Sequence, residues 1–345
     1  MVQLATNALT RSDNGICDSV VTMRRRDVIT LVGRVVVMWP CAARAQSDAP
    51  AVIGFLTSRA PGADAHLLAA FREGLQQMGY DEGRNVAIDY RFAENQYDRL
   101  PALAADLVRR QVTLIVANGI AVPPAKAATA TIPIVFTTGG DPVRLGFVAS
   151  LAHPGGNATG VTTSNIGNAL PRLALLRELV PHATTMGFLQ HPDSPLTNLP
   201  DVQAAAAAAG VGLVVVSARS DRELETVFAH LVQHKADTLL VGADPFFVSR
   251  RRDLVALAAR AAIPTIYFGR EFVEAGGLIS YAASLSGAYR DAGMYAGRVL
   301  NGEQPADMPV QQPTKFELVM NVKTAQALGL AVPRSILLRA DEVIQ

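Results

Sequence analysis

The sequence predicts an α/β protein made of two doubly wound parallel-sheet lobes. Short apolar runs rich in Val, Ile and Leu alternate with longer amphipathic segments along most of the 345 residues. This alternation predicts parallel strands joined by right-handed crossovers, and uninterrupted apolar runs fit strands that are buried on both faces. The same alternation begins again after Gly155-Gly156-Asn157, so two lobes of comparable size are expected.

The first lobe is expected to begin with the apolar strand Ala51–Thr57. His66–Met78 then shows the spacing of an amphipathic helix and ends at Gly79. The same reasoning gives the other elements of this lobe, which are strands Val86–Tyr90, Leu114–Ala117 and Ile134–Thr137 and helices Asp98–Arg110 and Ala121–Ala130.

The second lobe repeats these signals and is followed by a C-terminal return of the chain. Its predicted helices are Leu170–Val180, Asp201–Ala209, Asp221–Gln233 and Val248–Ala262. Its predicted strands are Thr185–Leu189, Leu213–Val216, Thr238–Val241, Thr265–Phe268 and Leu278–Tyr281. The return consists of helix Leu285–Leu300, the Pro-rich link Pro305–Pro313, strand Phe316–Asn321 and helix Thr324–Leu328.

Residues 1–45 are expected to lie outside the fold. Three arginines from Arg24 to Arg26, the apolar run Val28–Trp39 and the small-x-small site Ala43–Ala45 are typical of a secretory signal. The run is too short to span a bilayer. We expect translation to start at Met23 and cleavage to follow Ala45, and the paired arginines leave both the twin-arginine and the general export route open.

Charge and cysteine content exclude several classes of function. The 31 Lys and Arg nearly balance the 30 Asp and Glu, whereas nucleic-acid-binding proteins usually carry a basic excess. Cleavage after Ala45 leaves 300 residues; six Arg and three Asp leave with the signal, which changes the net charge from +1 to −2. Both cysteines, Cys17 and Cys41, leave as well, and a cysteine-free product suits an oxidising periplasm.

The sequence contains no recognisable catalytic motif, so we expect no catalytic residue, no cofactor and no metal site. The chain has no dinucleotide-binding or Walker A glycine loop and no G-x-S-x-G elbow. His230 and His234 share a helical face and could in principle ligate a metal. They lie at the exposed end of their helix beside Lys235, where solvated surface histidines are expected.

Polar residues recur where the predicted strands end. Each could simply cap a helix or form a turn, as Asp141 before Pro142 and Asp244 before Pro245 would. Their recurrence in both lobes instead predicts a cleft for a small polar ligand, because open α/β sheets bind ligands at the carboxyl ends of their strands. The candidates are Ser58, Asn118, Gly119, Thr137, Thr138 and Asp141 in the first lobe and Gln190, His191, Asp244 and Tyr281 in the second.

Six stretches carry a resemblance to a known family. The mature chain resembles the periplasmic substrate-binding proteins of ABC transporters, in the family that includes tryptophan/tyrosine-type binding proteins. The stretches are VIGFLTS (52–58), residues 71–108, residues 132–162, LLVGADPFF (239–247), EFVEAGGLISYAAS (271–284) and PTKFELVMNVKTAQALGL (313–330).

The resemblance implies a type I periplasmic-binding-protein fold with a three-crossover hinge. The crossings would fall near Val161-Thr162, Tyr281–Ser284 and Pro313–Phe316. Lobe one would comprise residues 51–161 plus 283–313, and lobe two residues 163–281 plus 314–345.

Carried over by position, all ten candidate residues would contact ligand. Asp244 would supply a carboxylate suited to an ammonium or to hydroxyl groups, and Tyr281 would stack on the ligand or bond to it near the hinge. Gln190-His191 replaces an Asn-rich turn that is frequent in the family. With 6% aromatic residues in the chain, the ligand's identity stays open.

The resemblance implies an exported, periplasmic solute-binding protein that is not itself membrane-spanning. It would capture a small polar ligand, such as an amino acid, and deliver it to an ABC permease. Two alternatives remain: a periplasmic sensor that serves a separate receptor, and an exported two-lobe enzyme.

Overall fold

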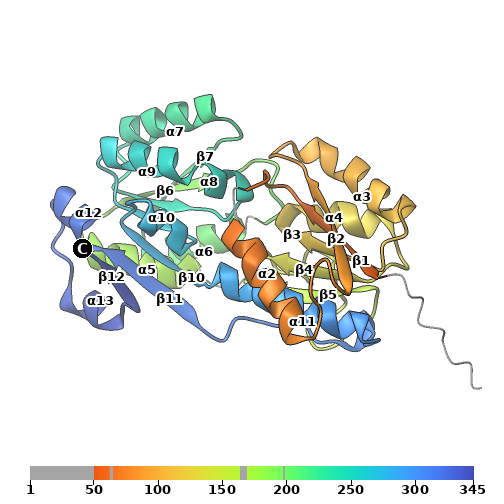
Figure 1. Cartoon of the computed structure of the whole chain (residues 1–345). Helices are drawn as coiled ribbons and strands as arrows, with labels where there is room; N and C mark the ends of the chain where they lie inside the picture. The colour runs from red at the N-terminus through yellow and green to blue at the C-terminus, as the bar shows by residue number, and fades with distance from the viewer. Residues whose placement is uncertain (1–49, 63–64, 164–168, 197–198) are drawn as a thin grey trace, which may run out of the picture. The chain divides into compact units, whose positions relative to one another are not determined.

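The structure, a computed structural model, describes residues 50–62, 65–163, 169–196 and 199–345 (Figure 1). The predicted leader at residues 1–45 and its expected cleavage site lie outside the described residues. Among the helices that are described, none is both long enough and apolar enough to cross a membrane.

The first sheet has five parallel strands in the order β2-β1-β3-β4-β5. Successive side chains of a strand face opposite sides, so Phe55 packs with α2 and α11 while Leu56 packs with α3 and α4. The strands are β1 Ala51–Thr57, β2 Val86–Phe92, β3 Leu114–Asn118, β4 Ile134–Thr138 and β5 Ala158–Thr162. The helices are α2 Ala65–Gln77, η2 Tyr97–Arg99, α3 Leu100–Arg109, η3 Gly119–Ala121, α4 Val122–Ala128, α11 Leu285–Leu300 and η4 Pro305–Asp307.

The second sheet has seven strands in the order β12-β11-β10-β9-β8-β6-β7. Leu240 packs with α5 and α6 on one face, and Leu239 packs with α7, α8 and α9 on the other. The strands are β6 Thr185–Gln190, β7 Gly212–Ser217, β8 Thr238–Val241, β9 Thr265–Tyr267, β10 Ile279–Ala283, β11 Phe316–Asn321 and β12 Glu342–Ile344. The helices are α5 Ala169–Leu179, α6 Leu199–Ala209, α7 Asp221–Gln233, α8 Pro245–Ser249, α9 Arg251–Arg260, α10 Arg270–Glu274, α12 Val322–Ala327 and α13 Arg334–Arg339.

The predicted α/β architecture is confirmed, and the two sheets are parallel except at one pairing. Strand β11 runs antiparallel to β10. The chain reaches β11 from the first lobe, not through a crossover helix of the second lobe, so the constraint that makes β-α-β strands parallel does not apply to it.

Most predicted helices and strands are confirmed, with ends shifted by a few residues. The single helix predicted at Val248–Ala262 is wrong: α8 begins at Pro245 and ends at Ser249, and Arg250 leaves the helical conformation before α9 starts. Four of the described strands and α-helices have no predicted counterpart, namely β5, α10, α13 and β12. Each has six residues or fewer, which is too short for a recognisable hydrophobic period.

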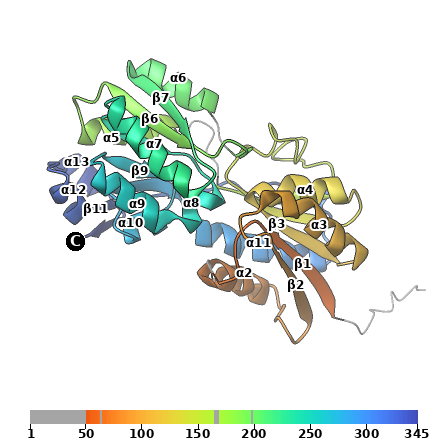
Figure 2. The ribbon, with the colours of Figure 1, turned by 90° about the horizontal axis from the view of Figure 1, so that it is seen from above.

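The chain passes between the two lobes three times, which gives the hinge its three crossovers (Figure 2). The first passage lies between β5 of the first sheet and α5 of the second lobe. The second leads from β10 to α11, which packs on the first sheet. The third leaves Gln311, whose N–H donates to Gly160 O at 2.9 Å and whose carbonyl accepts from Thr162 N–H at 2.8 Å, before β11 begins.

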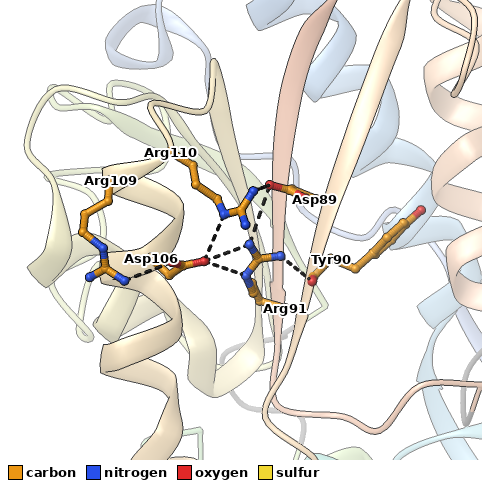
Figure 3. A network of polar contacts seen from close by, with 6 residues as sticks. All are labelled: Asp89, Tyr90, Arg91, Asp106, Arg109 and Arg110. Atoms are coloured by element: carbon orange, nitrogen blue, oxygen red, sulfur yellow. Dashed lines mark hydrogen bonds and ion pairs between the residues drawn. The ribbon is translucent and has the colours of Figure 1, made fainter.

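A charged network ties α3 to the edge strand β2 (Figure 3). Arg91 donates from Nε and Nη2 to Asp106 Oδ2 at 3.0 and 2.8 Å. Arg109 and Arg110 also bond to Asp106, and Arg110 reaches Asp89 on β2. The bonds from Arg91 are the main reason that the pKa of Asp106 lies below its ordinary value. Charged side chains along an exposed edge also discourage pairing with another strand.

The crossing of α2 and α11 depends on two glycines that let the helix backbones touch. A Cβ atom added to Gly74 would lie 1.9 Å from the Arg290 carbonyl oxygen, and one added to Gly293 would lie 2.1 Å from the Phe71 carbonyl oxygen. Backbone atoms cannot swing aside as a flexible side chain can, so any larger residue must push the helices apart.

We predict that Gly293→Ala lowers the free energy of unfolding by about 1–3 kcal/mol, the usual cost of overpacking a tight interface. Urea unfolding of the ligand-free protein measures this change. Gly156→Ala is the matched control, because its added Cβ meets no atom within 4 Å; we expect its stability to be unchanged or raised by up to about 1 kcal/mol. Equal stability of the two variants would contradict the close crossing.

Candidate functional site

A cavity of about 490 Å³ lies between the carboxyl ends of the strands of the two sheets. Its walls are formed by the segments after β1, β3, β4 and β5 in the first lobe and after β8 and β9 in the second, together with α5, α6 and α11. A volume between about 300 and 1,000 Å³ is typical of sites that enclose small organic molecules.

Asn118 and Thr137 form the buried polar wall of the first lobe. Asn118 ends β3, and its Nδ2 donates to Thr137 Oγ1 at the end of β4, at 2.7 Å. Both side chains are at most 5% exposed. Asn118 Oδ1 is buried and has no hydrogen-bond partner among the described residues. A residue of the cavity lining therefore carries a buried acceptor that no described group satisfies.

The turn after β4 gives the cavity a carboxylate. Asp141 Oδ1 accepts from the N–H groups of Val143 and Arg144 at 2.9 and 3.3 Å, so the side chain shapes its own turn. Thr138 Oγ1 accepts from Gly140 N–H in the same turn. Thr138, Asp141 and Arg144 all line the cavity, so this local network also sets the cavity surface.

Asp244 supplies the second lobe's buried carboxylate. It follows β8 and precedes Pro245, which stands at the first position of α8, where proline is favoured. Asp244 Oδ1 caps the helix by accepting from Phe246 N–H at 2.8 Å and also accepts from the Tyr97 hydroxyl at 2.6 Å. Asp244 Oδ2 is buried and lacks a partner among the described groups. One oxygen is thus anchored, and the other is unpaired in a side chain that lines the cavity.

Arg172 on α5 is a cavity residue that the sequence reasoning missed. Its Nε donates to the Tyr281 carbonyl at 3.0 Å, and it forms no ion pair with any described carboxylate. Burial lowers the pKa of Arg172 to about 10. The signal was present in the sequence, since Arg172 shares a helical stripe with the buried Leu176 and Leu179. A cation on a buried stripe indicates a site for an anionic group.

The rest of the cavity surface is mixed. Further ionisable residues line it, namely Arg59, Asp201 and Glu271, and so does the buried Tyr289. Apolar side chains supply much of the second lobe's wall, among them Phe188, Leu240, Val248 and Phe268. The cavity can therefore contact both charged and apolar groups of a ligand.

Six of the ten predicted site residues line the cavity: Asn118, Gly119, Thr137, Thr138, Asp141 and Asp244. The other four do not. Ser58 is buried, and its hydroxyl has no partner among the described residues. Gln190 donates from Nε2 to Ser217 Oγ on the neighbouring strand.

His191 and Tyr281 lie behind the cavity wall. His191 is 5% exposed and packs between the rings of Tyr97 and Phe246, with centroids 5.0 and 5.8 Å away. Tyr281 is not part of the cavity lining, and its ring lies 5.6 Å from that of Phe316. Tyr281 acts on the site only through its carbonyl, which holds Arg172.

The histidine pair on α7 lies away from the cavity lining. The rings of His230 and His234 are 3.9 Å apart, and both residues are exposed. Within the described ranges, no group of three or more His, Cys, Asp or Glu side chains is arranged to hold a metal ion.

The fold and the site define a two-lobe protein of the type I periplasmic-binding-protein class, with a cavity for a small ligand between the lobes. Residues 55–344 match the family model of ABC transporter substrate-binding proteins, and the chain belongs to this family. The family is one of binding proteins.

Individual relatives span most of the chain. A tyrosine-binding protein of Clostridioides difficile (strain R20291) is 29% identical over 265 residues, which are 75% of each chain. The crystal structure of an ABC domain in complex with L-Trp from Streptococcus pneumonia is 27% identical, with a TM-score of 0.80 over 86% of this chain and 100% of that one. A ligand-free, open substrate-binding protein with adhesive properties from Clostridium difficile is 25% identical, with a TM-score of 0.62 over 86% and 99%.

We predict that Asp244→Asn is more stable than Asp244→Ala by about 1–2 kcal/mol in the absence of ligand. Asparagine keeps an Oδ1 acceptor for Phe246 N–H and for the Tyr97 hydroxyl, whereas alanine removes the cap and leaves a buried hydroxyl unpaired. Urea unfolding of both variants measures the difference. If the two variants unfold at the same urea concentration, Oδ1 does not anchor this segment.

Proposed function

We propose that this chain is an exported solute-binding protein that captures a small α-amino acid between its lobes and delivers it to an ABC permease. The observation that carries the proposal is the pairing of two charges of opposite sign in one cavity. Arg172 is a desolvated cation with no described ion-pair partner, and Asp244 Oδ2 is a buried carboxylate oxygen with no described hydrogen-bond partner.

An α-amino acid complements these two groups. Its carboxylate would accept from the Arg172 guanidinium, and its ammonium would donate to Asp244 Oδ2 and Asn118 Oδ1. Hydrogen bonds between charged groups are shorter and stronger than neutral ones. Burial makes each unpaired group costly by itself, so a ligand that satisfies both would be favoured over one that satisfies neither.

The apolar wall supports a ligand with an apolar or aromatic side chain. Phe188, Phe268, Leu240 and Val248 would surround that side chain on the second lobe. The relatives named as a tyrosine-binding protein and as a complex with L-Trp support the same choice. Aromatic residues make up only 6% of the chain, so Phe188 and Phe268 would be the main aromatic contacts of the ligand.

Capture would follow from lobe closure. We assign residues 51–161 plus 283–313 to lobe one and residues 163–281 plus 314–345 to lobe two, with the three crossovers as the hinge. A ligand that contacts both lobes binds the closed state more tightly and so shifts the equilibrium towards it. An ABC permease would then dock the closed protein at the periplasmic face of the membrane, after the signal at residues 1–45 has directed export.

The hydrogen bonds of the described cavity residues fit a protein that binds its ligand without converting it. The threonine hydroxyls that line it bond to other groups: Thr137 to Asn118, Thr138 to Gly140 N–H, and Thr163 to the Thr138 carbonyl. In the described part of the chain, none of the three forms a hydrogen bond with a carboxylate that could act as its base. This favours a binding protein over the alternative of an exported enzyme.

The direct experiment is to identify what the purified protein carries. Mass spectrometry of material released by denaturation, followed by calorimetric titration with the twenty common L-amino acids, is expected to show at least one amino acid with an apolar or aromatic side chain. If none of the twenty binds, the proposed function is refuted.

We predict that Arg172→Gln weakens binding of the best amino acid about 10- to 100-fold. The variant loses a charge-assisted bond to the ligand carboxylate, which is worth roughly 1.5–3 kcal/mol. Arg177→Gln is the control, because it removes the same charge from the same helix but its guanidinium bonds to the Ala209 carbonyl and does not line the cavity. Titration calorimetry of both variants is the measurement, and equal affinities would remove Arg172 from the site.

A further inference from the structure

One hydrogen bond joins the cavity carboxylate of the second lobe to the first lobe. The hydroxyl of Tyr97, in η2 of the first lobe, donates to Asp244 Oδ1 at 2.6 Å. The Tyr97 ring packs against the core clusters of both lobes and lies 5.0 Å from the His191 ring. A second, longer bond runs alongside, from Asn95 Nδ2 to Ser249 Oγ at 3.3 Å. Tyr97 therefore bridges the two lobes, with its ring packed on both cores and its hydroxyl bonded to the second lobe.

The segment that carries Tyr97 is held rigidly by the first lobe. The N–H groups of Ala93, Glu94 and Asn95 donate to the carbonyls of Thr57, Arg59 and Ser58, so the pairing of β1 and β2 continues past the ends of the strands. Glu94 and Asn95 have φ values of +56° and +63°, a conformation that costs residues other than glycine energy and persists only where the surroundings enforce it. This geometry presents Tyr97 in a fixed position.

The chemistry of the pair makes Tyr97 a permanent donor. Burial, and then the neighbouring Asp244 carboxylate, raise the pKa of Tyr97 far above its ordinary value. The phenol therefore keeps its proton at any physiological pH, and Asp244 Oδ1 accepts from it and from Phe246 N–H together.

The two oxygens of Asp244 consequently have different requirements. In this structure Tyr97 from the first lobe completes the bonding of Oδ1. Oδ2 is buried in a side chain that is 1% exposed, and no described group satisfies it. A buried acceptor without a partner opposes closure, whereas an N–H donor on the ligand removes that opposition.

We propose that Tyr97 and Asp244 form an interlobe latch that couples closure to an ammonium or other N–H donor on the ligand. Tyr97 is a positioning residue in this latch: it does not contact ligand but orients Asp244 so that Oδ2 serves the cavity. The latch selects donor-bearing ligands, since closure over a ligand that lacks the donor leaves Oδ2 unpaired. The inference rests on the proposed function and adds a residue through which that site discriminates between ligands with and without an N–H donor.

The test compares Tyr97→Phe with the wild-type protein, with L-tryptophan and its deaminated analogue 3-indolepropionic acid as probes. If the wild-type protein binds another amino acid more tightly than L-tryptophan, that amino acid and its deaminated analogue are used as the probes. Phenylalanine keeps the ring packing on His191 and removes only the interlobe hydrogen bond. Because the latch forms after closure, we expect the dissociation rate constant of the amino acid to rise about 10-fold and the association rate constant to change less than twofold.

Tyr90→Phe is the matched control. The Tyr90 hydroxyl bonds to Arg72 and Glu82 within the first lobe and is not part of the cavity lining, so stopped-flow fluorescence should give wild-type rate constants for this variant. A Tyr97→Phe variant that also keeps wild-type rate constants would overturn the latch, whatever its stability.

Asp244→Asn gives an independent readout that does not depend on Tyr97. It retains Oδ1 for the latch and places an N–H donor where Oδ2 stood, so the preference for amino acid over deaminated analogue should fall at least 10-fold. Unchanged preference overturns the inference while amino-acid binding by the wild-type protein still supports the proposed function. Failure of the wild-type protein to bind any amino acid overturns both.

Discussion

The backbone contact between α2 and α11 determines how the two lobes are connected. Helix α11 follows a strand of the second sheet yet packs on the first, where Gly74 and Gly293 allow the two helices to touch. The chain must therefore leave the second lobe after β10 and return to it before β11. That return passes through Gln311, which bonds to both Gly160 and Thr162 beside the first crossing. The last strands of the second sheet, including the antiparallel β11, thus depend on a helix that belongs to the other lobe.

Three cavity-lining side chains share one arrangement, in which one atom is anchored to the fold and another has no described hydrogen-bond partner. Arg172 is held through Nε by the Tyr281 carbonyl, and Asn118 is held through Nδ2 by Thr137. Asp244 is held through Oδ1 by the start of α8. Anchoring removes the rotamer freedom that a ligand would otherwise have to restrict, while the unpaired atoms lower the stability of the ligand-free protein. A binding site of this kind is organised in advance at the expense of stability.

Much of the fold could be predicted from the sequence because its strands are long apolar runs and its helices have clear periods. Strand β1 and helices α7 and α11 agree with the prediction at both ends. Strand β5 could not be predicted in this way, since Ala158–Thr162 has one large apolar residue and includes Gly160, where an added Cβ would lie 2.0 Å from the Phe136 carbonyl oxygen. Its position depends on this contact with β4, which is tertiary.

The site could be predicted only where its residues stand at the ends of strands. Asn118, Thr137 and Asp141 do so and line the cavity. Arg172 comes from a helix face, and Tyr97 lies in η2, 147 residues away from its partner Asp244. Neither follows from the rule that places ligands at strand ends. Position at a strand end is also not sufficient, because the Tyr281 side chain is not part of the cavity lining while its carbonyl accepts a hydrogen bond from Arg172.

The two explanations for an aspartate before a proline, helix cap and ligand contact, are compatible in this protein. A carboxylate has two oxygens, and a cap at the start of α8 occupies only one of them. The cap fixes the side-chain rotamer and so gives the second oxygen a defined direction, which an uncapped aspartate in the same loop would lack. Because Tyr97 approaches the capped oxygen, the first lobe acts on the group without competing for the oxygen that remains. The residue types that sequence reasoning assigns to turns are therefore also those best suited to present a single, oriented acceptor to a cavity.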